Sequence, residues 1–281
     1  MSTKNFSVRK VSLNAKTKSF TDVLAEEEPL EINLTYWNKN CKFRQSLSLT
    51  MRTPGNDHDL VRGFIFSEGI IQTEADIKSL KSCGPLLKGG HQNIVRLELD
   101  RKCVFSPQVL SRNFLSSSSC GICGKSSLEA LTSTRLQKMK RKREAVSIRK
   151  ETLFSLPDRF SDSQVLFART GGMHGVGLFD LEGQLVLSGE DVGRHNALDK
   201  VIGKALKRYP IPLRNHILFL SGRVSFELVQ KAIVAGVPLI VALGAPSSLA
   251  IEMAHEYGLA LIGFLRERQL NIYSDLGLIL K

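Results

Sequence analysis

Three short apolar runs in the last third of this chain constrain its fold more than any other feature. They read HILFLSG (216–222), PLIVALG (238–244) and LALIGFL (259–265), and each has the length of a buried strand. Two segments with helical periodicity, 224–236 and 246–258, separate them and are long enough for crossover helices. Continuously apolar strands alternating with helices are typical of a parallel sheet covered on both faces. The pattern therefore predicts a βαβαβ unit and an α/β fold class.

The first part of the chain predicts a separate, smaller α+β domain over residues 1–112. Residues 1–20 are polar and basic, and we expect them to form a loose tail. The elements that follow are indicated by alternating or helical patterns of apolar residues. They are strands over 31–37 and 42–51, a helix over 59–70 and a strand over 93–100.

Residues 113–281 are predicted to hold a cysteine loop, a basic helix and the α/β domain. Residues 175–191 alternate in the manner of a hairpin, with Glu182-Gly183 at its turn. A helix should follow over 195–208.

Composition excludes several classes of protein. With 42% hydrophobic and 23% charged residues, the chain has the composition of a folded globular protein. No apolar run is long enough to span a membrane, and the N-terminus lacks the apolar core of a signal peptide. Five cysteines, an odd number, fit a reducing compartment better than a disulfide framework. We therefore expect a cytoplasmic protein without a membrane partner.

The charge of the chain is strongly positive. The net value of +12, from 39 Lys and Arg against 27 Asp and Glu, favours a polyanionic partner such as nucleic acid, a nucleotide cofactor or an acidic protein surface. Six basic residues lie in RLQKMKRKR (135–143), which is typical of a solvated helix face or a basic connector. Aromatic residues are not interleaved with these charges, so we expect no nucleic-acid partner.

The motif SSSSCGICGK (116–125) places Cys120 and Cys123 among small residues just before a predicted helix. A structural zinc site is disfavoured, because the chain has no second Cys-x-x-Cys pair and no closely spaced histidines. A thioredoxin-like dithiol would follow the first strand of a βαβ unit, whereas this pair lies in the middle of the chain. The third interpretation is an exposed thiolate, stabilised by helix N-terminal amides and by Lys125. Such a thiolate could accept sulfur as a persulfide and pass it on.

A second candidate site lies where the three apolar strands end. Ligands of open parallel sheets bind beyond the carboxyl ends of the strands, where the loops 221–225, 244–248 and 264–269 would meet. The first two loops open helices whose backbone amides suit phosphate oxygens. Guanidinium groups can add charge-assisted hydrogen bonds, and the candidates are Arg223, Arg266 and Arg268. The alternative is that the serines only cap helices and the arginines are only solvated.

Two histidines lie in glycine-containing polar stretches. His174 belongs to TGGMHG (170–175) and His195 to EDVGRHNALDK (190–200). Either imidazole could act as a general acid or base, although a single histidine is more often structural.

Taken together, these stretches resemble one family, the formate dehydrogenase accessory proteins (FdhD), which are sulfur carriers for the molybdenum cofactor. The resemblance covers nearly the whole chain in order and leaves out only the N-terminal tail and the basic connector. The matching stretches are EEPLEI (27–32), MRTPGND (51–57), GFIFSEGII (63–71), SSCGICGK (118–125), TGG-x-H (170–174), EDVGRHNALDKVIG (190–203), SGRVSFELVQKA (221–232), GAPSSLA (244–250) and GFLRERQLNIYS (263–274).

The resemblance implies a specific chemistry. The family takes sulfur from a cysteine desulfurase as a persulfide and transfers it to the bis(molybdopterin guanine dinucleotide) molybdenum cofactor, for use by formate dehydrogenase. The family's persulfide cysteine corresponds to Cys120, with Cys123 as the second member of the pair. Its cofactor-binding stretch corresponds to Phe264, Leu265, Arg266, Glu267, Arg268 and Gln269.

The resemblance also implies an architecture and an oligomer. Members of the family have a cytidine-deaminase-like three-layer αβα domain without the zinc ligands, and they act as homodimers. On this basis the chain is a sulfurtransferase-type carrier that acts on a cofactor, with GDP as an analogue of one dinucleotide arm and with no metal of its own. Two alternatives stay open: a cofactor chaperone that does not use its cysteines, and a disulfide oxidoreductase.

Overall fold

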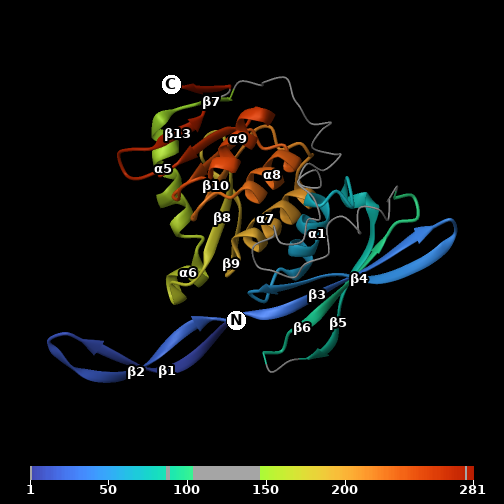
Figure 1. Ribbon diagram of the computed structural model, residues 1–281, viewed down its shortest axis with the longest axis horizontal. Helices are drawn as coiled ribbons and strands as arrows, with labels where there is room; N and C mark the ends of the chain where they lie inside the picture. The colour runs from blue at the N-terminus through green and yellow to red at the C-terminus, as the bar shows by residue number, and fades with distance from the viewer. Residues whose placement is uncertain (1, 87–88, 104–145, 276) are drawn as a thin grey trace.

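The computed structural model describes residues 2–86, 89–103, 146–275 and 277–281. The motif with Cys120 and Cys123, the predicted basic helix and the predicted domain boundary near residue 112 lie outside the described residues. Within the described part, two β-sheets and the helices packed on them form most of the molecule (Figure 1).

The first unit is a four-stranded sheet in the order β4-β3-β6-β5, covered on one face by helix α1 (Asp57–Ser67). Alternate residues of β3, such as Leu30, Ile32 and Leu34, point into the core, as the period-2 pattern requires. The strands are β3 (Glu28–Asn38), β4 (Cys41–Arg52), β5 (Ile77–Leu86) and β6 (Gln92–Leu99), and a short 3-10 helix spans Glu74–Asp76. The predicted strands and helix of this unit are confirmed, and β5 is an addition to them.

The second unit is a six-stranded sheet in the order β13-β12-β11-β10-β8-β9. Strands β10 (His216–Leu220), β11 (Leu239–Ala242) and β12 (Ala260–Gly263) run parallel, which confirms the predicted βαβαβ unit. The predicted hairpin also forms and extends the same sheet, so the sheet is mixed. It consists of β8 (His174–Asp180) and β9 (Leu185–Asp191), and β13 (Asn271–Ser274) pairs antiparallel at the opposite edge.

Helices cover both faces of the second sheet, giving three layers. On one face lie α7 (Arg194–Arg208), α8 (Phe226–Ala235) and α9 (Ser248–Tyr257), whose apolar residues share a core with the sheet. On the other face lies α5 (Lys150–Ser161), where the Phe160 ring packs 5.1 Å from the Phe219 ring, centroid to centroid. The predicted α/β class with an αβα arrangement is therefore observed.

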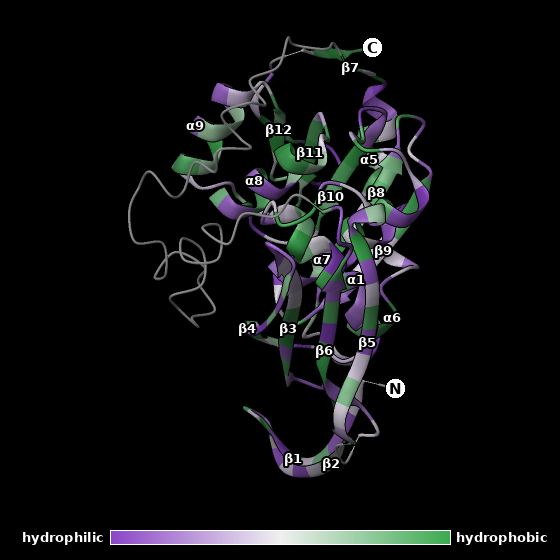
Figure 2. Cartoon of the chain, turned by 90° about the vertical axis from the view of Figure 1, so that its right-hand side faces the viewer, coloured by the Kyte–Doolittle hydropathy of each residue, from purple (hydrophilic) through white to green (hydrophobic). Residues whose placement is uncertain are grey.

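The two units share one continuous core through helices α1 and α7. These helices approach so closely that a Cβ on Gly63 would overlap the Asp199 carbonyl group, and one on Gly203 would overlap the Asp59 carbonyl group. Glycine at both crossing positions allows the backbones to touch. Figure 2 shows the sheets on either side of this helix pair.

The structure corrects the expectation of a loose N-terminal tail. Strands β1 (Thr3–Ser12) and β2 (Ala15–Ala25) pair in an antiparallel hairpin that projects from the body (Figures 1 and 2). We call residues 3–25 the arm. The arm is mostly polar, so the alternation of polar and apolar residues that indicates a strand is not evident in its sequence. Cross-strand pairing, rather than burial, stabilises this hairpin.

A small parallel pair lies beside α5. Strand β7 (Val146–Ile148) pairs with β14 (Leu278–Leu280), and the Lys281 amide donates to the Ile148 carbonyl over 3.0 Å. Ile148 is buried in the core beneath α5. The short helix α6 (Val165–Thr170) follows α5. Among the helices that the structure describes, none combines the length and the apolar character needed to cross a membrane.

Candidate functional site

Chain segments from five places meet at one end of the second sheet, which we call the carboxyl edge. The parallel strands β10, β11 and β12 end there, followed by the loops 221–225, 243–247 and 264–269. Because β8 and β9 run antiparallel to them, β8 begins at this edge and β9 ends there. The edge therefore also receives the residues around His174 and the start of α7.

The loops at the carboxyl edge are joined by backbone hydrogen bonds. The Gly244 amide donates to the Gly222 carbonyl over 3.1 Å, and the Phe264 amide donates to the Gly244 carbonyl over 3.2 Å. Val224 and Ser247 continue the connection, since Val224 accepts from the Ser247 amide over 3.0 Å. The three loops therefore form one rigid floor rather than three independent segments.

Three helices begin at this floor. Their N-cap residues are Gly193 for α7, Ser225 for α8 and Ser247 for α9. Only Ser247 caps its helix with its side chain, accepting from the Ala250 amide over 3.3 Å. The N-cap residues of α7 and α8 make no side-chain cap, so the α7 N-terminus presents amides at the positive end of the helix dipole, whereas the acidic Glu227 lies in the first turn of α8. Such amides can bind phosphate oxygens.

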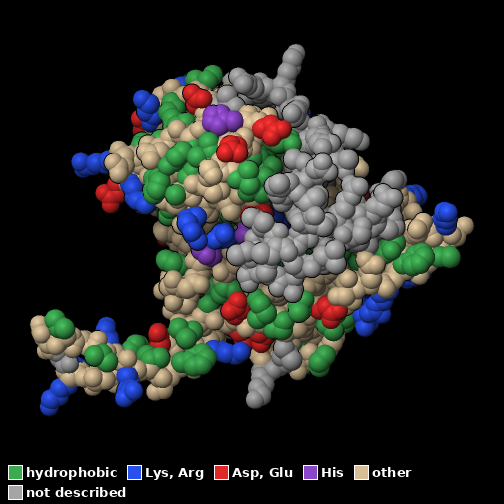
Figure 3. All heavy atoms as spheres, viewed as in Figure 1, with side chains coloured by type: hydrophobic (Ala, Val, Ile, Leu, Met, Phe, Trp, Pro, Cys, Tyr) green, Lys and Arg blue, Asp and Glu red, His purple; other side chains and the backbone are tan. Residues whose placement is uncertain are grey.

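The side chains around these helix ends are mainly cationic. Burial lowers the pKa of His174, and the charges of Arg194, His195 and Arg223 lower it further against the opposing effect of Asp191. Gly222 lies beneath this imidazole, since a Cβ there would be 3.1 Å from His174 Nδ1. Figure 3 shows basic and histidine side chains together near the middle of this face of the molecule. The edge therefore favours an anion.

His195 contacts two residues of the neighbouring loop and helix. Its Nε2 lies 3.2 Å from Ser225 Oγ and 3.6 Å from Glu227 Oε2. Burial alone would raise the pKa of Glu227, but the His195 side chain, the residue's own amide and Ser225 outweigh it and lower the pKa to about 2. A carboxylate that stays ionised in this position orients the imidazole of His195.

A buried ion pair fixes the end of β9. Lys200 Nζ lies 2.7 Å from Asp191 Oδ2 and donates to the Thr53 carbonyl over 2.9 Å. Asp191 Oδ2 also accepts from the Thr53 amide over 3.1 Å. These bonds hold the loop after β4, in the first unit, against the carboxyl edge. The ion pair also offsets the negative charge of Asp191.

The stretch 264–269 differs in part from what the sequence predicts. Phe264 has a φ of 51°, an unusual left-handed conformation for an aromatic residue, and its side chain is 39% exposed. Leu265 is fully buried, so its side chain packs in the core and cannot contact a ligand at the surface. Glu267, Arg268 and Gln269 are exposed.

Arg266 is partly used by the fold itself. Its Nη1 donates to the carbonyls of Leu243 over 2.7 Å and Leu265 over 2.8 Å. The Arg266 amide also donates to the Gln269 carbonyl over 2.8 Å, which closes the turn. The guanidinium therefore holds the loop in shape, and it lies 5.9 Å from the centre of the Phe264 ring.

The structure thus brings together some of the predicted site residues and leaves others untested. The loop of Arg223 and the stretch of Phe264 and Arg266 meet at the edge, whereas Cys120 and Cys123 lie outside the described residues. Sequence reasoning missed that His174, Arg194 and His195 reach the same edge. Their signal was the antiparallel hairpin before α7, whose place in the sheet a local pattern does not reveal.

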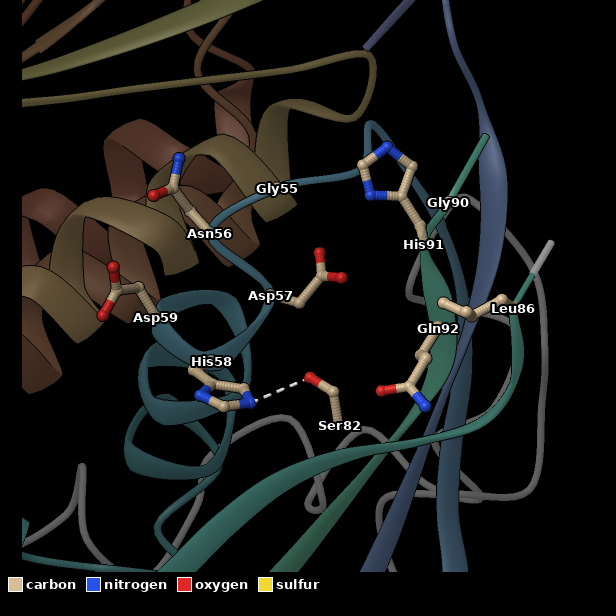
Figure 4. A pocket seen from close by; sticks show the side chains of 10 residues that line it. All are labelled: Gly55, Asn56, Asp57, His58, Asp59, Ser82, Leu86, Gly90, His91 and Gln92. Carbon is tan, nitrogen blue, oxygen red and sulfur yellow. Dashed lines mark hydrogen bonds between the residues drawn. The ribbon is translucent and has the colours of Figure 1, made fainter. Parts of the chain in front are cut away.

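A separate cavity of about 410 Å³ lies in the first unit, between the start of α1 and strands β5 and β6 (Figure 4). Inside it, His58 Nε2 lies 3.0 Å from Ser82 Oγ. Asp57 lines the cavity but is paired with the buried Arg52, Oδ1 to Nε 2.9 Å. Asp59 also lines it, so its carboxylates make this cavity a poor site for a polyanion.

The fold and the edge together define a three-layer α/β protein with a cationic site at the carboxyl edge of its sheet. The sequence signature of the FdhD/NarQ family matches residues 25–279. The chain therefore belongs to the FdhD/NarQ family.

Relatives and a solved structure agree with this assignment. The chain is 43% identical over 255 residues to the sulfur carrier protein FdhD of Streptomyces coelicolor, covering 90% of this chain and 87% of the relative. It is 41% identical over 253 residues to the sulfur carrier protein FdhD of Sulfurisphaera tokodaii, covering 90% of both chains. A crystal structure from Desulfotalea psychrophila, described as a formate dehydrogenase accessory protein, matches with a TM-score of 0.70 at 21% identity, covering 98% of this chain and 97% of the other. At that identity the match concerns the fold alone.

Proposed function

We propose that this protein is a sulfur carrier that accepts sulfur on Cys120 from a cysteine desulfurase and transfers it to a molybdenum cofactor destined for formate dehydrogenase. The names of the relatives support the carrier role, and the description of the similar structure supports the link to formate dehydrogenase. We further propose that it acts in the cytoplasm and as a homodimer.

The first step of the proposed reaction is an exchange between thiols. The Cys120 thiolate attacks the outer sulfur of the desulfurase persulfide, forming a new S–S bond while the old one breaks. The desulfurase cysteine leaves as a thiolate, so no external oxidant or reductant is needed. The small residues around Cys120 allow a bulky donor to approach. In this scheme Cys123 is dispensable for loading, because one thiolate suffices.

The observation that carries the second half of the proposal is the convergence of α7, α8 and cationic side chains at the carboxyl edge. A guanine dinucleotide carries a pyrophosphate, and uncapped helix amides with nearby arginines suit its oxygens. The substrate of the transfer, the bis(molybdopterin guanine dinucleotide) cofactor, would be held there by its dinucleotide arms. Arg223 and Arg268, both exposed, are the side chains best placed to move toward phosphate.

Phosphate contacts do not bind the guanine base, and the Phe264 ring supplies a surface for it. The ring is exposed beside the cationic loop, and the left-handed backbone of the residue positions it there. Backbone outliers of this kind are often kept where a ligand requires them. Glu267 and Gln269 offer polar groups for the edge of guanine. In this proposal phosphate binds at the floor of the site and guanine binds at the 264–269 stretch.

Mass spectrometry after incubation with a cysteine desulfurase and cysteine tests the carrier role. We expect wild type and Cys123→Ala to gain one sulfur atom, about 32 Da, whereas Cys120→Ala gains none. An adduct that persists in Cys120→Ala would place the persulfide on another residue.

GDP binding, measured by titration calorimetry in wild type and in the same two variants, separates a sulfur carrier from a cofactor chaperone and from a disulfide oxidoreductase. A cofactor chaperone would bind GDP but gain no sulfur in any variant. A disulfide oxidoreductase would bind no GDP and would need both cysteines. A carrier binds GDP equally in all three proteins and loses sulfur only with Cys120.

A further inference from the structure

The arm is joined to the rest of the protein only near its base, among the residues that the structure describes. There the Glu26 amide donates to the Ser2 carbonyl over 2.9 Å, and Arg169 Nη2 donates to Thr3 Oγ1 over 3.4 Å. From this base the two strands extend away from both sheets, as Figures 1 and 2 show from two directions. A two-stranded hairpin without a sheet or helix behind it is marginally stable in water. Its apolar residues therefore call for a partner.

One face of the arm carries a short apolar stretch between charged residues: Phe6 lies opposite Asp22, and the Lys10–Lys18 pair follows on the tip side. Val8 lies opposite Phe20 in the antiparallel register, so the two side chains share a face with Phe6, two residues away. Phe6 is 49% and Phe20 44% exposed. The opposite face pairs Ser7 with Thr21 and is polar.

The tip of the arm is more exposed still. Leu13, in the turn, is fully exposed, with a relative accessibility of 101%, and Val11, just before it, is 77% exposed. Two large aliphatic side chains at the end of a projecting hairpin form a convex apolar surface. A protein groove would have to enclose such a tip, whereas the interface of a lipid bilayer accepts it without a shaped pocket.

The charges around this tip have a single sign. Residues 5–21 contain no aspartate or glutamate, and their basic residues flank the tip on both strands. These are Arg9, Lys10, Lys16 and Lys18. Lys10 and Lys18 lie opposite each other, next to the Val8–Phe20 pair on the apolar face. Cations beside a shallow apolar surface match the phosphates of anionic lipids, which lie just outside the acyl chains.

We propose that the arm docks reversibly on the surface of an anionic lipid bilayer, with Val11, Leu13 and the Phe6–Phe20 face in the interface and the lysines at the phosphates. The proposal departs from the expectation that the chain has no membrane partner, which rested on the absence of a spanning segment. A second copy of the chain is the competing occupant, and the test below separates it from the bilayer.

Co-sedimentation with lipid vesicles tests the proposal on the full-length protein. We expect binding to vesicles of equal parts phosphatidylglycerol and phosphatidylcholine, little binding to phosphatidylcholine alone, and release by high salt. Each basic residue near an anionic surface changes the affinity roughly fivefold, so Lys16→Gln with Lys18→Gln should weaken binding at least tenfold. Val11→Ser with Leu13→Ser should also release the protein.

A matched control comes from an exposed apolar residue outside the arm. Phe43→Ser, on β4, removes a side chain that is 44% exposed, and it should bind vesicles as wild type does. Circular dichroism on every variant checks that the body is folded. The proposal is overturned if wild type does not bind anionic vesicles, or if the tip variant (Val11→Ser with Leu13→Ser) binds them as well as wild type does. Sedimentation velocity measures self-association and completes the test. If wild type does not bind vesicles and self-association is lost only in the tip variant, the arm is an interface between copies of the chain.

Discussion

The carbonyl oxygen of Gly222 occupies the space where Gly244 would place a Cβ, only 2.5 Å from that position. The Arg223 nitrogen is almost as close, at 2.6 Å. The loops after β10 and β11 are therefore in direct backbone contact at the carboxyl edge. Any side chain at position 244 must separate them.

Gly244→Ala should consequently impair the site more than the small size of the added methyl group suggests. We expect a loss of about 1 to 3 kcal/mol in stability and at least a tenfold loss in GDP affinity, because the backbone cannot yield as a flexible side chain would. Gly172→Ala is the control, since its Cβ would have no atom nearer than 3.9 Å. Thermal unfolding and calorimetry measure both effects. An unchanged GDP affinity in Gly244→Ala would place the nucleotide away from these loops.

Arg266 and Arg268 should give different results when each is replaced by Ala. Because Arg266 donates to the carbonyls of Leu243 and Leu265, its loss should lower both the melting temperature and the GDP affinity. Arg268 is exposed, so its replacement should lower the affinity alone, by roughly tenfold if one charge-assisted contact is lost. Replacing both should leave persulfide formation on Cys120 intact. Calorimetry, thermal unfolding and mass spectrometry are the measurements, and two variants that lose only stability would exclude this loop from phosphate binding.

The pH dependence of GDP binding should report on His174. Burial and then Arg194 lower its pKa in the free protein, so a bound phosphate should raise that pKa again. A ligand that raises a pKa binds more tightly as pH falls through it, so affinity should increase below the ordinary histidine value. In His174→Gln the profile should lose this component. An identical pH profile in wild type and variant would show that phosphate does not approach His174.

The buried pair Asp199–Lys231 supports the helices behind the site. Lys231 Nζ lies 2.8 Å and 2.9 Å from the two carboxylate oxygens. Lys231→Met should cost about 3 to 5 kcal/mol at neutral pH, because Asp199 is left charged and unpaired in the core. Lys207→Met, which removes an exposed lysine 3.6 Å from Asp59, should cost no more than about 1 kcal/mol.

The loss of stability in Lys231→Met should also depend on pH, and the titration of the Asp199 carboxyl group determines the direction of that dependence. Burial raises the pKa of Asp199 even with Lys231 present, and removing the lysine raises it further. A group whose pKa is higher in the folded state stabilises the fold at low pH and loses that contribution as pH rises. The difference in free energy of unfolding between wild type and variant, measured by chemical denaturation, should therefore become smaller as the pH is lowered. A pH-independent difference would mean that lost packing, not charge, is responsible.

The sequence predicts local elements here better than it predicts their assembly. The strands of the parallel unit are evident because burial on both faces makes their residues continuously apolar, as in Leu239 to Ala242. The hairpin turn is equally local, since Gly183 has the positive φ of 78° that such a turn needs. The meeting of the loops at the carboxyl edge is predictable in outline for the same reason, because these loops directly follow recognisable strands.

What the sequence does not reveal depends on long-range contacts. The place of β8 and β9 in the sheet, which brings His174 and Arg194 to the edge, is decided by pairing with β10. The buried position of Leu265 and the structural use of Arg266 follow from the neighbouring loop. The arm was missed because its strands are stabilised by each other and are not buried. Local periodicity carries no signal for any of these relationships.

The pairing of β7 with β14 also sets an order of events during synthesis. β7 is where the chain re-enters the described fold after residues 104–145, which carry Cys120. Its partner, β14, leaves the ribosome long after it, so Val146 and Ile148 have no strand to pair with until nearly all of the second sheet has been translated. The β7–β14 pair can thus form only after the strands of the carboxyl edge have been synthesised.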